Sequence, residues 1–128
     1  IFAADLMREI ELSAQISFVK LASYVGTSST GSVCEMIGLN VDISGRDVVV
    51  VEDIVDSGLT MKYVTEMLAK YNPRSISICT LLLKPGNLKV DLDIPYKCFS
   101  IPNDFILGYG LDYDGYGRNT RDIYTVVE

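Results

Sequence analysis

The spacing of apolar residues predicts a helix at the start of the chain and two strands after it. Within residues 1–12 the apolar positions follow roughly the 3.6-residue period of an amphipathic helix: Ile1, Phe2, Leu6 and Ile10. Residues 14–23 alternate loosely between apolar and polar positions, which favours a strand, and residues 33–39 favour a second one. Residues 24–32 (YVGTSSTGS) are rich in Gly, Ser and Thr, so we expect a mobile loop between the two strands.

The middle of the chain predicts a strand, a helix and another strand. Residues 48–51 are four consecutive valines, and such a run is typical of a central strand in a parallel sheet covered on both faces. Ser57 can cap the helix that follows. The core-facing positions of this helix recur at i, i+3 and i+7: Met61, Val64 and Leu68. Residues 71–74 break the helix, and residues 75–83 (SISICTLLL) complete a βαβ unit as a second apolar strand.

The last third of the chain predicts short strands and no second domain. We expect these strands near residues 96–101, 104–108 and 123–127, and no linker separates them from the preceding elements. The 128 residues are 48% apolar and 22% charged, which is typical of one globular domain with its own core. The pattern therefore predicts a single α/β domain over residues 1–128.

Composition and charge exclude several classes of function. The formal net charge is −6 and the 11 Lys and Arg residues are scattered, so no basic stripe favours nucleic acid. The absence of histidine excludes histidine-based triads and histidine metal ligands. Three cysteines without a CxxC spacing argue against disulfides and zinc: Cys34, Cys79 and Cys98. With no membrane-length apolar run and no signal-like segment, we expect a cytoplasmic protein without a membrane partner.

A cluster of acids stands where the valine strand ends. Glu52, Asp53 and Asp56 lie in what we call the acidic turn, residues 52–56, and acids at the end of an interior strand are costly unless they bind something. The helix N-terminus that follows combines backbone N–H groups, hydroxyls and a glycine, which suit a phosphate: Ser57, Gly58, Leu59 and Thr60. The carboxylates would repel that phosphate, so they suit sugar hydroxyls, Mg²⁺ or a proton.

Three interpretations of the acidic turn remain open on local chemistry. The first is a sugar-phosphate site, with hydroxyls at Glu52 and Asp53 and the phosphate at the helix N-terminus. The second is an Asp that caps the helix beside two solvated acids. The third is a Mg²⁺-binding acid at a strand end, as in Walker B sites. We favour the first because it accounts for both halves of the turn.

The stretch VVVVEDIVDSGLT resembles the phosphoribosyl-pyrophosphate signature of type I phosphoribosyltransferases, an apolar strand with two adjacent acids and then D-[ST]-G-x-T. This resemblance implies a Rossmann-like, mostly parallel sheet flanked by helices, with a small hood built partly from the C-terminal segment. It implies that Glu52 and Asp53 hold the ribose hydroxyls and that residues 56–60 cradle the 5′-phosphate. In this family the acid at the position of Asp56 is the general base.

Further segments resemble the hypoxanthine-guanine members of that family. LASYVGTSSTG is similar to their Ser-Tyr flexible loop, which implies a lid that contains Ser23 and Tyr24. LLLKPGN is similar to the segment with their base-recognising lysine, here Lys84, whose ammonium can donate to a 6-oxo group. Without the resemblance, Lys84 would be interpreted as a solvated lysine in a turn.

The segment IPNDFILGYGLDYDGYGR is similar to their purine-binding and C-terminal segment. It implies that Phe105 stacks on the purine and that the backbone of Ile106 lies at its edge. Asp112 corresponds to an acid near the base and the metal, and Arg118 to an arginine that faces pyrophosphate. Taken singly, Phe105 is more typical of a core aromatic and Arg118 of a surface arginine, and Asp112 can equally be a turn acid. The implied Mg²⁺ ligands are Glu52, Asp53 and Asp112.

The implied activity is purine salvage in a homodimer or homotetramer. The phosphoribosyl group of phosphoribosyl pyrophosphate would pass to hypoxanthine or guanine with Mg²⁺, giving IMP or GMP. The alternatives are a transferase for xanthine or a pyrimidine, a non-catalytic regulator that senses phosphoribosyl pyrophosphate, and a truncated structural remnant. Family members also carry, before the segment that matches IFAADL, a strand and a Leu-Lys-Gly-type loop that binds pyrophosphate. If the molecule begins at Ile1, we expect poor or no catalysis.

Overall fold

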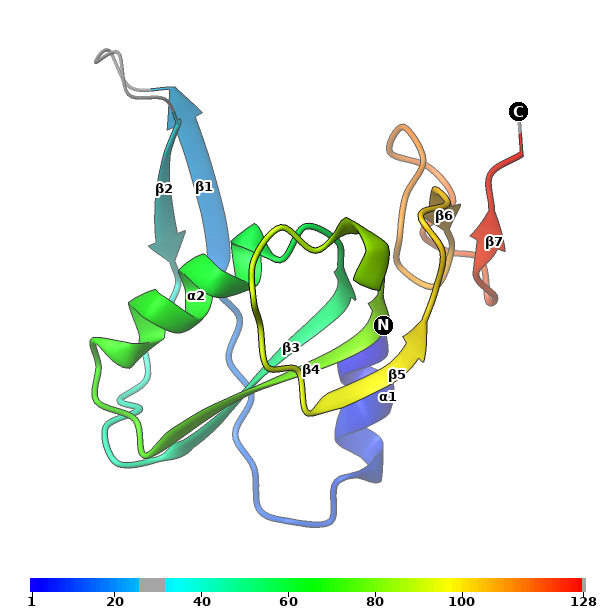
Figure 1. Ribbon diagram of the computed structural model, residues 1–128. Coiled ribbons are helices and arrows are strands. Elements are labelled where there is room, and N and C mark those ends of the chain that lie inside the picture. Colours follow the sequence, from blue (N-terminus) through cyan, green and yellow to red (C-terminus); the bar gives the residue numbers. More distant parts are fainter. Residues whose placement is uncertain (26–31, 128) are drawn as a thin grey trace.

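The structure is a computed structural model that describes residues 1–25 and 32–127 (Figure 1). The described elements follow one another in this order: α1 (Phe2–Glu9), β1 (Lys20–Val25), β2 (Ser32–Ile37), β3 (Asp47–Val55), α2 (Leu59–Ala69), β4 (Ser75–Leu83), the 3₁₀ turn η1 (Pro85–Asn87), β5 (Tyr96–Ser100), β6 (Ile106–Leu107) and β7 (Tyr124–Thr125). Within the described ranges, no helix is long and apolar enough to cross a membrane.

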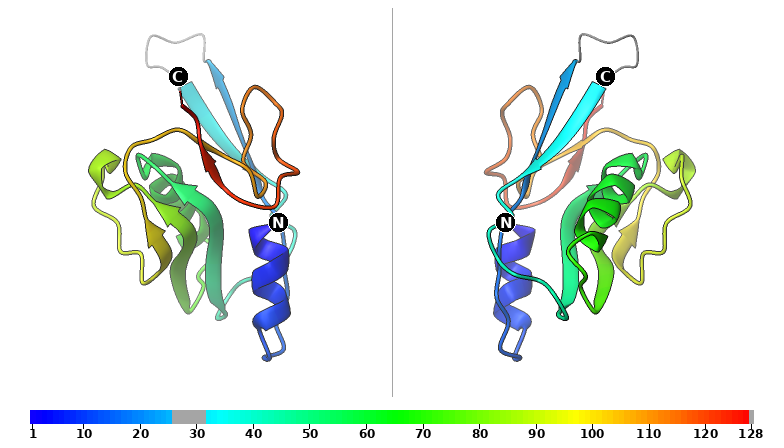
Figure 2. Two further views of the ribbon diagram at one scale, coloured as in Figure 1. Left: turned by 90° about the vertical axis from the view of Figure 1, so that its right-hand side faces the viewer. Right: turned by 90° about the vertical axis from the view of Figure 1, so that its left-hand side faces the viewer.

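A parallel sheet in the order β3-β4-β5 forms the centre of the fold. Val48 lies opposite Ile76 and Val55 opposite Leu83, so β3 and β4 run in register over their whole length. Helix α2 connects these strands and covers one face of the sheet, while α1 lies against the other face (Figure 2). The predicted βαβ unit and the α/β class with flanking helices are therefore confirmed.

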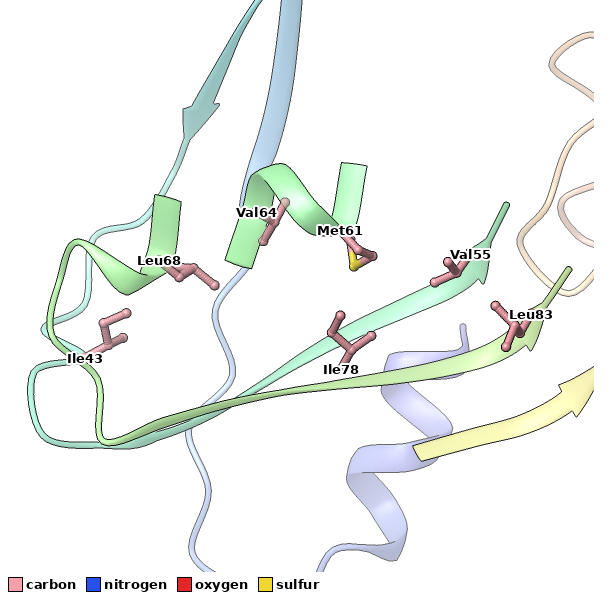
Figure 3. Close-up of a cluster of buried hydrophobic side chains, with 7 residues drawn as sticks. All are labelled: Ile43, Val55, Met61, Val64, Leu68, Ile78 and Leu83. Atoms are coloured by element: carbon pink, nitrogen blue, oxygen red, sulfur yellow. The ribbon is translucent and has the colours of Figure 1, made fainter. Parts of the chain in front are cut away.

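The larger hydrophobic cluster lies between α2 and the sheet (Figure 3). Its buried members come from α2, the two central strands and the turn before β3: Ile43, Val55, Met61, Val64, Leu68, Ile78 and Leu83. The three helix positions predicted to face the core are among them. A second cluster on the opposite face joins Phe2 of α1 to Leu81 and Leu82 of β4. Burying these side chains on both faces holds the ends of β3 and β4 in place.

The valine strand differs from its prediction in two respects. Among the described residues β4 is the middle strand of the sheet, and β3 lies at its edge. Val48 and Val50 pack toward the α2 cluster, whereas Val49 is 53% exposed and Val51 39% exposed. The expectation of a central strand covered on both faces is thus wrong, because α1 reaches the second face only near Ile54, Cys79 and β4's Leu81 and Leu82.

The beginning of the chain contains less regular structure than its pattern predicts. Helix α1 ends at Glu9 and β1 begins only at Lys20, so residues 11–19 form neither helix nor strand. Ile16 and Phe18 are exposed there, since they pack into neither cluster. β1 pairs antiparallel with β2, and this hairpin extends away from the central sheet (Figure 1).

The C-terminal segment forms the hood, which we define as residues 105–125. β6 and β7 pair antiparallel and lie beside the end of the sheet where β3, β4 and β5 finish (Figure 1). All three predicted C-terminal strands are present, although β6 and β7 are shorter than expected. A hydrogen bond from the Tyr109 hydroxyl to the Asp5 carboxylate ties the hood to α1.

Candidate functional site

Glu52 and Asp56 of the acidic turn line a cavity at the carboxyl end of β3, although Glu52 and Asp53 lie within that strand and not in a turn. This cavity has a volume of about 150 Å³, and its other lining residues include Ser57, Gly58 and Thr60 but not Asp53. The two halves recognised in the sequence, carboxylates and a helix N-terminus, therefore share one concave site. In α/β sheets this end of the strands is the usual place for a ligand.

Gly58, not Ser57, is the N-cap of α2. Its φ of +82° is left-handed, and a Cβ there would lie 2.9 Å from Cδ1 of Leu92, so glycine fits the position best. The Ser57 hydroxyl still accepts a hydrogen bond from the N–H of Leu59 at 3.3 Å. The expectation that Ser57 caps the helix is corrected by one residue, and the interpretation of an Asp cap is wrong.

Glu52 has its carboxyl group in a mostly enclosed position. Its Oε1 accepts the backbone N–H of Asp53 at 3.0 Å. Burial, followed by the adjacent Asp53 carboxyl, raises the pKa of Glu52 to about 8. The interpretation of two solvated acids fails for this residue. At neutral pH a protonated Glu52 can donate a hydrogen bond as well as accept one.

Asp56 has the opposite environment, because two donors hold its carboxylate. The Asn87 amide donates to Oδ1 at 2.8 Å, and the Lys84 ammonium donates to Oδ2 at 3.3 Å. Chiefly through Asn87, and then through Lys84, these contacts keep the pKa of Asp56 below its ordinary value. Asp56 is therefore an ionised acceptor at neutral pH, as a general base must be.

Lys84 is buried, with only 6% of its surface exposed. Its backbone N–H donates to the carbonyl of Val55 at 3.0 Å, which fixes the start of the following turn beside β3. The interpretation of a solvated turn lysine is therefore wrong. We did not predict a role for Asn87, although its place three residues after Lys84 in a Pro-Gly turn could have indicated one.

The hood presents an aromatic pair. The Phe105 and Tyr113 rings meet edge to face, with 5.7 Å between centroids and 82° between planes. Phe105 is 56% exposed, so it is not a core aromatic and remains available to stack on a ligand. Ile106, the next residue, pairs with Thr125 in the β6–β7 sheet.

Asp112 and Arg118 form an ion pair within the hood at 3.1 Å. Arg118 also donates to the carbonyl of Gly110 at 2.8 Å, and Asp112 accepts the N–H of Gly115 at 2.8 Å. Both side chains thus stabilise the hood turn in this structure. Their roles near the metal and pyrophosphate remain predictions.

The acids expected to bind Mg²⁺ do not form a single cluster. Over residues 1–25 and 32–127, no group of three or more Asp, Glu or Cys side chains is arranged to hold a metal. Glu52 and Asp53 remain a suitable pair, since Mg²⁺ commonly uses one or two carboxylates together with substrate phosphates. A bound divalent cation would favour the ionised form of Glu52, against the burial that chiefly raises its pKa.

The lid expectation falls largely outside the described residues. Ser23 and Tyr24 belong to the backbone of β1, and Ser32 begins β2. Residues 26–31, the middle of the expected loop, lie outside the described ranges.

Comparison with known proteins gives a consistent set of relatives. The model of the phosphoribosyl transferase domain matches residues 1–114. The hypoxanthine-guanine phosphoribosyltransferase of Mycobacterium bovis is 46% identical over 127 residues, which cover 98% of this chain and 63% of that protein. The hypoxanthine phosphoribosyltransferase of Escherichia coli is 45% identical over 113 residues, covering 88% of this chain and 64% of that protein. This chain thus spans slightly less than two thirds of these relatives.

Solved structures agree in fold. A crystal structure of a hypoxanthine-guanine phosphoribosyltransferase from Bacillus anthracis has a TM-score of 0.89 and 41% identity, and covers 98% of this chain and 75% of its own. A hypoxanthine phosphoribosyltransferase mutant from Trypanosoma cruzi, in a ternary complex with substrates, has a TM-score of 0.89 and 34% identity. The match covers 98% of this chain and 70% of that one.

Proposed function

The chain belongs to the phosphoribosyltransferase family, and from this premise we propose that it acts in purine salvage. It would transfer the phosphoribosyl group of phosphoribosyl pyrophosphate to hypoxanthine or guanine, giving IMP or GMP and pyrophosphate. The observation that carries this proposal is the cavity shared by the acidic turn and the N-terminus of α2. We further propose a cytoplasmic homodimer or homotetramer, with neither nucleic acid nor membrane as a partner.

The cavity suits the two ends of a ribose 5-phosphate. Glu52 and Asp53 offer carboxyl groups for the ribose hydroxyls, and Glu52 can donate as well as accept because its pKa is raised. The first amides of α2 have no intrahelical acceptor, and with the hydroxyls of Ser57 and Thr60 they suit a 5′-phosphate.

The base would lie between Lys84 and the hood. The buried Lys84 ammonium can donate to the 6-oxo group of hypoxanthine or guanine, and it disfavours adenine, whose amino group is itself a donor. Phe105 would stack on the purine, with the backbone of Ile106 at its edge. Asp56 would take the proton from N7 as N9 bonds to the ribose carbon C1′.

The remaining groups would stabilise the leaving pyrophosphate and exclude water. Glu52 and Asp53 would hold Mg²⁺ as ionised carboxylates, so the donor role of Glu52 belongs to the metal-free site, and the ion would supply positive charge against the pyrophosphate. Arg118 is proposed to face the pyrophosphate and Asp112 to approach the base and metal, although here they bind each other. The lid with Ser23 and Tyr24 would keep water from the positively charged ribose.

Asp56→Asn tests the proposed chemistry directly. Asn keeps the size of the side chain but cannot accept the proton, so turnover should fall by about 10²–10⁴-fold. Binding of phosphoribosyl pyrophosphate, measured by calorimetry, should be largely spared. Turnover is followed in the longest form of the protein that contains residues 1–128, with Asp93→Asn, on the exposed loop before β5, as the matched control. Unchanged turnover would remove Asp56 as the base.

A base panel separates the alternatives. Hypoxanthine, guanine, xanthine and a pyrimidine are each offered with phosphoribosyl pyrophosphate and Mg²⁺, and the nucleotide product is quantified. Product from hypoxanthine or guanine supports the proposal, whereas product from xanthine alone or from the pyrimidine alone would replace its substrate class. Binding of phosphoribosyl pyrophosphate without product from any base would favour the regulator.

A further inference from the structure

The two carboxylate oxygens of Asp56 have different partners. Oδ1 accepts the side-chain amide of Asn87 at 2.8 Å, and Oδ2 accepts the ammonium of Lys84 at 3.3 Å. Both donors come from the segment after β4, about thirty residues further along the chain. The neutral amide makes the shorter of the two contacts.

Backbone hydrogen bonds build the contact between Asn87 and Asp56. The N–H of Lys84 donates to the carbonyl of Val55 at 3.0 Å, and the N–H of Lys89 donates to the carbonyl of Ser57 at 2.8 Å. These bonds attach the turn to the residues directly before and after Asp56. The N–H of Asn87 also donates to the carbonyl of Lys84 at 3.1 Å, which closes η1. The Asn87 amide therefore approaches Asp56 from a backbone held at three points.

The charged neighbours of Asp56 cannot replace this amide. Lys84 is assigned to the 6-oxo group of the base, which competes with Oδ2 for its ammonium. Glu52 lines the same cavity, but its described hydrogen bond is to the backbone N–H of Asp53 and not to Asp56. The side chain of Lys89 is exposed, and its described contact with the acidic turn is through its backbone. Asn87 is thus the donor to Asp56 for which no proposed ligand contact competes.

We propose that Asn87 is a positioning residue whose amide holds Oδ1 of Asp56, so that Oδ2 takes the proton from the purine. The inference rests on the proposed function. In the step concerned, N9 forms a bond to C1′, and the bond from C1′ to the pyrophosphate oxygen breaks with its electron pair on pyrophosphate. The proton on N7 passes to Oδ2, the oxygen that Asn87 does not hold, while Oδ1 keeps its hydrogen bond to Asn87.

Two substitutions separate a hydrogen-bonding role from simple packing. Asn87→Ala removes the donor, and kcat should fall by about 10-fold. Asn87→Asp keeps the shape but places a carboxylate against Oδ1, and kcat should fall by about 100-fold or more. The KM for phosphoribosyl pyrophosphate should stay within about twofold in both, because neither touches the phosphate site. A packing role would give the reverse order, with alanine worse than aspartate, and would overturn the proposal.

A readout that needs no turnover keeps this inference distinct from the proposed function. The carboxyl carbon of Asp56 is titrated by NMR in the wild type, Asn87→Ala and the control Asn103→Ala, whose side chain lies against Gly86 in the same turn. Loss of the amide should raise the pKa of Asp56 in Asn87→Ala alone, and the acidic limb of the kcat profile should move to higher pH with it. An unchanged titration, or a shifted titration with unchanged kcat, would refute the role of Asn87. These kinetics use the longest form of the protein that contains residues 1–128, and absence of turnover on any base in that wild type would refute the proposed function, and with it the proton transfer assigned to Asp56.

Discussion

The pKa values of Glu52 and Asp56 shift in opposite directions although the two residues are only four positions apart. Burial beside Asp53 raises the pKa of Glu52, while hydrogen bonds from Asn87 and Lys84 lower that of Asp56. One carboxyl group is therefore protonated and the other ionised at neutral pH. Such a division lets neighbouring acids perform different tasks, one as a donor to a ligand and one as a base.

Glu52→Gln should stabilise the metal-free chain above neutral pH. The folded pKa of Glu52 is above its ordinary value of 4.5, so between pH 4.5 and about 8 the unfolded chain releases a proton that the folded chain retains. The free energy of unfolding should therefore fall as pH rises through this window, by up to about 1.4 kcal/mol per pH unit. Gln cannot ionise, so the free energy of unfolding of Glu52→Gln should not show this fall. Urea denaturation at several pH values in EDTA measures the free energy of unfolding of both proteins.

The control for this prediction is Glu66→Gln on the exposed face of α2. Its unfolding free energy should follow the wild type at every pH. If the free energy of unfolding of Glu52→Gln also follows the wild type at every pH, Glu52 is ionised in the folded state. The donor role assigned to it is then lost.

The turn from β3 into α2 owes its shape to packing as well as to backbone geometry. Gly58 is left-handed, and the segment after η1 closes over it, so that a Cβ would meet Leu88, Val90 and Leu92 at 2.9–3.1 Å. The same segment carries the turn that holds Asp56. The helix N-terminus proposed to bind the phosphate and the proposed general base Asp56 therefore both depend on the contact between the turn from β3 into α2 and the segment after β4.

Gly58→Ala should destabilise the protein more than a glycine substitution in open space. Gly45 provides the matched control, because its φ is +70° and a Cβ added there would meet no atom within 4 Å. Gly45→Ala should cost about 1 kcal/mol through backbone strain, and Gly58→Ala about 1 kcal/mol more through crowding. Urea denaturation measures both variants. Equal losses would show that the loop after η1 does not press on Gly58.

In the described part of the chain, the β3 edge of the central sheet has no neighbouring strand. β3 is an edge strand, and Val49 and Val51 on it are exposed, as are Ile16 and Phe18 in the irregular segment before β1. Edge strands with exposed apolar residues are uncommon unless something covers them. The chain also spans about 63% of the Mycobacterium bovis relative.

The 128-residue chain, assayed by itself, should show poor or no turnover. Because the chain spans 63% of the Mycobacterium bovis relative, part of that relative's binding site can lie outside the matched region. Steady-state production of IMP is the measurement, with the Mycobacterium bovis enzyme as the reference. A rate comparable with that enzyme would contradict the prediction.

The amino-acid pattern alone determined the features that depend on neighbours in the chain. The βαβ unit, the three buried positions of α2 and the acids at the end of β3 were all predicted, because strand and helix periods and turn residues act over a few positions. The motif in the acidic turn likewise predicted a sugar-phosphate ligand. The pattern of apolar residues gave wrong predictions where structure depends on contacts with other elements. Val49 and Val51 are exposed, and residues 14–19 do not form a strand.

Only the tertiary structure decided the environment of each functional group. Lys84 could have been a solvated turn residue, and its burial against β3 follows from the packing of two loops. The partnership of Asp56 with Asn87 joins residues 31 apart, and that of Asp112 with Arg118 depends on the shape of the hood turn. Residue type sets which proton or charge a side chain can carry. Its pKa and its partner follow from the atoms that folding brings around it.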